Sequence, residues 1–312
     1  MKNQSFTLEN INMQFSKNTR KTPDGLSSWL HRSFGKLTCC CLISLTLAHG
    51  SQAEIPGLIL DLNADRDVTL EDGNFVSLWQ NQVAAFPAKD FVKRDQGRKE
   101  PGSGRPVLLR QVKELNGHNA LDFRKQELVC MHETAFASLA TGSGCTWIAV
   151  LSVHEQRSGL KNVKSFFGNL RNGGKYDGLW GCFTDDNTLW WGVRNGITFG
   201  RFDENNKQVF GPKLELERFY ILAGRLAAGT GLVNVEVFVD SPAPFATQEM
   251  LISPDAHGSK MAIGQERDVI NHPGVESFDG EIARFMIFQR PLSDAELQAQ
   301  FATLQNTYNV KK

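Results

Sequence analysis

The sequence has no net charge, because 34 lysine and arginine residues balance 34 aspartate and glutamate residues. This balance gives no electrostatic reason to expect nucleic acid or an anionic membrane as a partner. A basic stretch at residues 93–105 lacks the interleaved aromatic residues that stack on bases, so nucleic-acid binding is not predicted. After residue 53 there is no C-x-x-C motif and no Cys/His pair at ligand spacing, which argues against a zinc site.

Long apolar runs are also missing. The apolar run at residues 37–48 is shorter than the roughly 20 residues that cross a bilayer. Five basic residues lie between residues 17 and 36, and the small residues Ser51 and Ala53 precede Glu54 at cleavage-site positions. This order is typical of a secretory signal, whereas a buried helix is disfavoured because nothing amphipathic surrounds the run. We therefore predict a signal peptide at residues 1–53 and a secreted mature protein, extracellular, on the cell surface or periplasmic, with no membrane span.

Removal of the signal peptide would leave three cysteines, Cys130, Cys145 and Cys182. An odd number allows either one disulfide and one free thiol or no disulfide at all. The sequence leaves both arrangements open.

From residue 54 onward the sequence is a series of short segments typical of β-strands. Residues 233–239 alternate, with valines on one face, and residues 146–153 are apolar on both faces, as in a strand covered on each side. No repeat or second compositional region divides residues 54–312, so we predict a single domain. The other expected strands are residues 58–62, 76–80, 120–123, 164–168, 189–193, 219–226, 260–264 and 280–288.

One long helix is predicted near the end of the sequence. Ser293 and Glu296 have the spacing of a capping box, in which each side chain bonds the backbone of the other. Four apolar residues then recur at helical spacing and form one stripe that can pack on a sheet. They are Leu297, Phe301, Leu304 and Tyr308.

Several of these segments resemble a known family when taken together. They are residues 58–65, 72–73, 76–82, 105–106, 115–117, 120–123, 278–283 and 288–296. Their order is similar to that of the bacterial LamG-like jelly-roll family of the concanavalin A-like lectin/glucanase superfamily. The resemblance implies an all-β, concanavalin A-like jelly-roll β-sandwich with one C-terminal helix. Residues 83–86 and 124–125 depart from the turns of that family.

The resemblance leaves the function open, because lectins, carbohydrate-binding modules, glucanases and lyases share this fold. Glucanases need two carboxylates in one cleft, about 5 Å apart in the retaining enzymes. No Glu-x-Asp-x-x-Glu occurs after residue 53, and the nearest pair with the same strand parity is Glu236 and Asp240. Asp240 directly precedes a Ser-Pro-Ala-Pro strand end. We therefore predict no catalytic residue and keep a glycan-cleaving hydrolase or lyase as the alternative.

Aromatic and polar residues between residues 170 and 206 predict a binding site in loops. Sugar rings stack on aromatic side chains while their hydroxyls bond to planar polar groups. Trp190 and Trp191 are adjacent, so only one of them can line a given face of a strand. The candidate ligand-binding residues are Tyr176, Trp180, Asp185, Asn187, Trp190, Trp191 and Arg194. We predict a non-catalytic carbohydrate-binding module, and a protein-protein interaction domain as a second alternative.

A structural calcium ion is a further expectation. Calcium takes six to eight oxygen ligands, often carboxylates and loop carbonyls. The resemblance implies a calcium site near the first and last strands, where Asp279 would be the matching carboxylate.

Overall fold

The computed structural model describes residues 55–93, 104–156, 160–171, 175–198, 203–266 and 274–310. All of them belong to one compact unit, Ala53–Lys312. The predicted signal peptide and residues 94–103 of the basic stretch lie outside the described residues. In the part of the chain that is described, no helix has the length and apolar character needed to cross a membrane.

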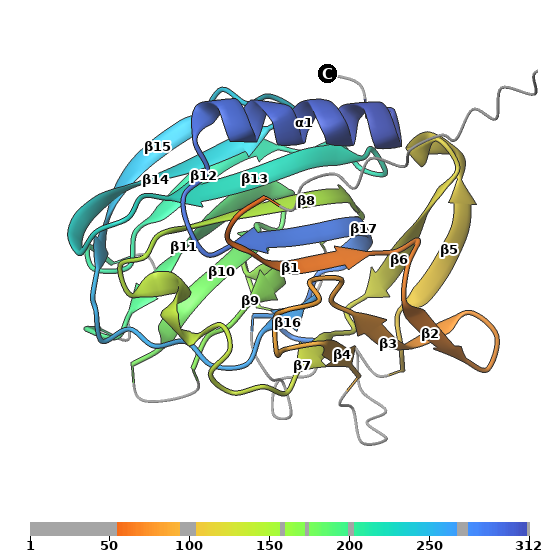
Figure 1. Ribbon diagram of the computed structural model, residues 1–312, viewed down its shortest axis with the longest axis horizontal. Coiled ribbons are helices and arrows are strands. Elements are labelled where there is room, and N and C mark those ends of the chain that lie inside the picture. The colour runs from red at the N-terminus through yellow and green to blue at the C-terminus, as the bar shows by residue number, and fades with distance from the viewer. Residues whose placement is uncertain are drawn as a thin grey trace, which may run out of the picture. The chain divides into compact units, whose positions relative to one another are not determined.

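The described part is all-β with one C-terminal α-helix, which confirms that level of the prediction (Figure 1). Every segment expected to be a strand contains one, and the helix α1 (Asp294–Tyr308) begins after the predicted cap, Ser293. The strands are β1 (Leu58–Asn63), β2 (Val68–Glu71), β3 (Phe75–Gln80), β4 (Asp90–Val92), β5 (Val107–Val112), β6 (His118–Arg124), β7 (Leu128–Cys130), β8 (Cys145–Val153), β9 (Lys164–Gly168), β10 (Asp177–Phe183), β11 (Thr188–Asn195), β12 (Gln208–Lys213), β13 (Tyr220–Leu226), β14 (Gly231–Val239), β15 (Ala246–Ile252), β16 (Ala262–Ile263) and β17 (Asp279–Phe288).

The strands form one antiparallel sheet that nearly closes on itself. Its order runs β15–β14–β13–β8–β17–β6–β5 and continues through β3–β4–β7–β16–β9–β10–β11–β12. β1 pairs with β17, and β2 pairs with β3. The two end strands, β12 and β15, contact each other without strand pairing in the described residues. This pairing establishes a nearly closed sheet, while the finer jelly-roll assignment remains a proposal.

The main core lies where the two halves of the sheet face each other. Trp147 of β8 meets Trp191 of β11 edge to face, with ring centroids 5.7 Å apart. The Trp191 indole N–H also donates to the Glu236 carbonyl of β14 at 3.0 Å, which satisfies a buried donor and ties the halves together. Gly224 of β13 makes room for this pair, because an added Cβ would lie 2.2 Å from the Trp147 indole nitrogen.

A second core lies between α1 and the outer face of β8, β13 and β17. The capping box is present: the Glu296 amide donates to the Ser293 side chain, and the Glu296 carboxylate accepts from the Ser293 amide. The four residues of the predicted stripe are buried in this core, so the apolar face of the helix was correctly located. They are Leu297, Phe301, Leu304 and Tyr308.

The three described cysteines are free thiols, all buried. Of the two arrangements that the sequence left open, this is the one without a disulfide in the described residues. Burial raises the pKa of the Cys145 thiol to about 12, so this group is not a thiolate at neutral pH.

Candidate functional site

Most of the residues predicted to bind ligand in loops lie on or between two paired strands. β10 and β11 form a hairpin that occupies residues 177–183 and 188–195. Trp180 and Trp190 lie on the outer face of this hairpin, near Cys182, while Trp191 points into the main core. Alternation along β11 therefore separates the two adjacent tryptophans, as strand geometry requires.

Neither outward-facing tryptophan reaches the surface. Trp180 and Trp190 stack edge to face with centroids 4.8 Å apart, and they are 1% and 0% exposed. The Trp190 indole N–H donates to the Asn162 carbonyl at 3.0 Å. Arg194 is buried beside them, its guanidinium carbon 5.2 Å from the centroid of the partly buried Tyr176 ring and 5.6 Å from that of Trp180. These four predicted residues are brought together, but as a covered cluster.

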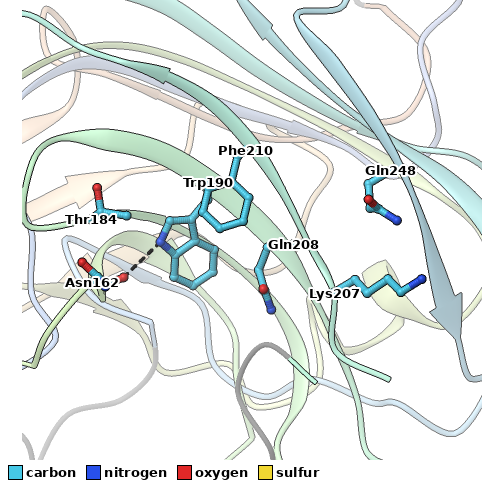
Figure 2. Close-up of a pocket in the computed structure, with 7 residues that line it drawn as sticks. All are labelled: Asn162, Thr184, Trp190, Lys207, Gln208, Phe210 and Gln248. Atoms are coloured by element: carbon cyan, nitrogen blue, oxygen red, sulfur yellow. Dashed lines mark hydrogen bonds between the residues drawn. The ribbon is translucent and has the colours of Figure 1, made fainter. Parts of the chain in front are cut away.

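A pocket of about 430 Å³ lies beside this cluster (Figure 2). It is at the seam where the two end strands of the sheet, β12 and β15, approach each other without pairing. Its volume is within the range of about 300–1,000 Å³ usual for small-molecule sites. The lining residues are Asn162, Thr184, Trp190, Lys207, Gln208, Phe210 and Gln248.

Phe210 of β12 is the aromatic surface of this pocket. Its side chain is 46% exposed and pairs across the strands with Trp190. Sequence reasoning missed Phe210 because Gly211 and Pro212 follow it and interrupt the strand pattern. Proline is tolerated here because β12 is an end strand, and in the described residues it pairs with β11 along one edge only. One pattern in the sequence could have located Phe210. Along this strand Val209 points into the core, whereas its neighbours Gln208 and Phe210 point outward.

The polar residues that line the pocket form two pairs, one on each side of it. On one side, the Thr184 hydroxyl donates to Asp186 at 2.5 Å, and the Asn162 carbonyl accepts from Trp190. On the other side lie the exposed Lys207 and, on β15, Gln248. Figure 2 shows these two pairs on opposite sides of the Trp190 and Phe210 rings.

Asp185 and Asn187, also predicted to bind ligand, shape the turn between β10 and β11. Asp185 accepts from the Lys164 ammonium at 2.5 Å and from the Asn162 amide at 2.9 Å. Burial raises the pKa of Asp185, but these hydrogen bonds outweigh it and hold the pKa below its usual range. Asn187 adopts a left-handed conformation with φ of 68° and is buried. Neither side chain is among the residues that line the pocket.

The acidic pair considered for catalysis is divided between two ion pairs. Glu236 bonds Arg225 at 2.6 Å, and Asp240 bonds Arg218 at 2.9 Å. Asp240 also accepts from the Ile221 amide at 2.8 Å. The described lining of the pocket contains no aspartate or glutamate, so a two-carboxylate mechanism finds no residues among them.

Asp279, the candidate calcium ligand, lies in an ionic cluster at the start of β17. Its Oδ1 atom is 2.9 Å from Nδ1 of His154 and 3.3 Å from the Arg124 guanidinium. Asp122 and Glu281 complete the cluster, and Glu281 is 3.7 Å from Nε2 of His154. The described residues contain no group of three histidine, cysteine or acidic side chains arranged to hold a metal ion. The calcium site at Asp279 thus remains a prediction.

No model of a known protein family matches the sequence, and no curated protein matches it. Comparison with solved structures finds several that are similar at low identity. A Trypanosoma rangeli sialidase in complex with sialic acid has 15% identity and a TM-score of 0.45, over 80% of this chain and 33% of the sialidase. The binding domain of botulinum neurotoxin DC in complex with SialylT has 10% identity and a TM-score of 0.48, over 80% of this chain and 52% of the other.

A third similar structure is the CBM40 of the Ruminococcus gnavus IT-sialidase bound to alpha2,3 sialyllactose. It has 17% identity and a TM-score of 0.38, over 55% of this chain and 93% of the module. This chain spans a third of the length of the sialidase and about half that of the toxin binding domain. At these identities and TM-scores the likeness carries no functional assignment, which therefore rests on the pocket itself.

Proposed function

We propose that this protein is an exported, non-catalytic module that binds a glycan in the pocket beside Phe210. The observation that carries the proposal is a half-exposed aromatic ring flanked by amide side chains in a pocket of suitable size. Export follows from the predicted signal peptide, and a jelly-roll fold follows from the family resemblance. Both are parts of the same proposal.

The chemistry of the pocket suits a sugar ring. A pyranose presents an apolar face of C–H groups, which stacks on an aromatic ring, and an edge of hydroxyls, which need donors and acceptors. Phe210 supplies the apolar surface, while Gln208 and Gln248 lie next to it and across the seam. Trp190 lies beside Phe210 on the neighbouring strand β11, and its ring is buried.

A hydrolase or lyase on the same fold is the alternative. Such an enzyme needs positioned acids or bases at the bound glycan. The described residues that line the pocket include one titratable side chain, Lys207, and no carboxylate. Binding without turnover is therefore the better-supported function.

The test is glycan binding by wild type and by Phe210→Ala, with Phe75→Ala as the matched control. Phe75 of β3 is 45% exposed, almost the same as Phe210, but lies outside the pocket. A glycan array identifies ligands, and calorimetry then measures their affinities. Losing the stacked ring should weaken binding about 10- to 100-fold, whereas Phe75→Ala should leave it unchanged. Equal affinity of wild type and Phe210→Ala would refute the proposal, and release of reducing ends would favour the hydrolase.

A further inference from the structure

One residue gives the pocket its charge. Lys207 immediately precedes β12, is exposed, and is the one charged side chain among the described lining residues. In the described part of the chain its ammonium forms neither an ion pair nor a hydrogen bond. An ammonium group has three donors and no acceptor, so this side of the pocket offers a ligand a positive donor.

The backbone that carries Lys207 is fixed. Asp203 accepts hydrogen bonds from the amides of Asn205 and Asn206 at 3.0 and 2.9 Å, which orders the turn before Lys207. Gly192 of β11 lets the Lys207 backbone approach closely, because an added Cβ would lie 2.8 Å from the Lys207 carbonyl oxygen. The backbone from which the Lys207 side chain projects is therefore ordered before any ligand binds.

The opposite side of the pocket has no charged side chain among its described lining residues, and the exposed Asp186 lies next to it. Hydrogen bonds from the Thr184 and Thr188 hydroxyls hold the pKa of Asp186 below its usual range, so this carboxylate is ionised at neutral pH. The Thr184 hydroxyl is committed to Asp186, and the Asn162 carbonyl to the Trp190 indole. Among the described lining residues, a carboxylate on a ligand would find a charged donor only on the side with Lys207.

We propose, resting on the proposed function, that the glycan carries a carboxylate, and that Lys207 binds this group while Phe210 stacks on the sugar ring. Gln248 of β15 lies on the same side of the pocket as Lys207. Its amide donates one hydrogen bond to the Glu249 carbonyl, and its second N–H is a further donor for the anion. Charge-assisted hydrogen bonds of this kind are stronger than those between neutral groups.

The test compares acidic sugars with neutral partners of the same size. The probes are an oligogalacturonate and its methyl ester, and sialyllactose and its methyl ester, so that uronic and sialic acids are distinguished. Calorimetry at low and at physiological salt measures each affinity. One of the acidic probes should bind about tenfold more tightly than its neutral partner, and the preference should decrease as salt increases.

The variants assign this preference to one side chain. Lys207→Gln should abolish the preference for the acidic probe, while Lys207→Arg should keep it. Lys213→Gln is the control, because Lys213 is exposed on the same strand but does not line the pocket. Equal binding of acidic and neutral probes, or a preference that survives Lys207→Gln, would overturn the inference. If Phe210→Ala still weakens glycan binding in that case, the proposed glycan-binding function stands, and only the inference about the carboxylate fails.

Discussion

Unfolding experiments can decide which aromatic residue of the site is structural, before any ligand is known. Trp190 and Phe210 are cross-strand neighbours, yet the former is 0% and the latter 46% exposed. Replacing each by alanine therefore removes a ring from very different surroundings. Trp190→Ala deletes an edge-to-face contact with Trp180 and the hydrogen bond to the Asn162 carbonyl.

The two expected effects differ several-fold. Truncating a fully buried tryptophan costs about 3–5 kcal/mol, because the transfer free energy is lost and a cavity remains. The half-exposed Phe210 makes few buried contacts, so its truncation should cost about 1 kcal/mol or less. The free-energy cost of Trp190→Phe should lie between these values, since phenylalanine keeps part of the apolar volume but lacks the indole N–H that bonds the Asn162 carbonyl.

Equilibrium unfolding in urea, followed by far-ultraviolet circular dichroism, measures both variants against wild type. This signal comes mainly from the backbone, and equal m-values would justify comparing the free energies. The reasoning fails if Trp190→Ala costs less than about 1 kcal/mol, or if Phe210→Ala destabilises as much as Trp190→Ala. A small cost of Trp190→Ala would mean that the Trp190 indole is accessible to solvent, as the sequence analysis expected.

Three further predictions concern the rest of the protein. Asp61→Ala should destabilise by about 3–5 kcal/mol in urea unfolding, because it leaves Arg284 without the carboxylate that it bonds twice at 2.8 Å, and Arg284→Met in the same chain should recover part of the loss. Burial lowers the pKa of His154, but hydrogen bonds to Asp279 and Glu281 outweigh it and raise the pKa to about 9. The resulting stability, about 2–3 kcal/mol, should be present below pH 6.5 and lost as the pH rises through about 9, and a flat profile in His154→Gln is the control. The calcium site proposed at Asp279 predicts that EDTA lowers the Tm of wild type but not that of Asp279→Asn; an unchanged wild-type Tm would exclude a structural ion there.

The elements that sequence patterns located are those with local causes. The run at residues 146–153 is β8, covered on both faces by core residues, as the apolar residues on both of its faces predicted. The capping box at Ser293 and Glu296 fixed the start of α1, because its two hydrogen bonds join residues three apart. Strands of weaker pattern were missed, among them β12, whose Gly211 and Pro212 are acceptable because it is an end strand.

By itself the sequence determined the strands of strong pattern, the helix and the parity that sends Trp190 and Trp191 to opposite faces, because these depend on residues close together in the chain. Tertiary structure alone decided that Trp190 is covered and that Phe210 is the open ring. It also decided that Gln248 of β15 would stand on the side of the pocket with Lys207. The physical reason is that exposure and a binding site depend on which distant strands meet, and a strand's own alternation carries no information about what covers its outer face.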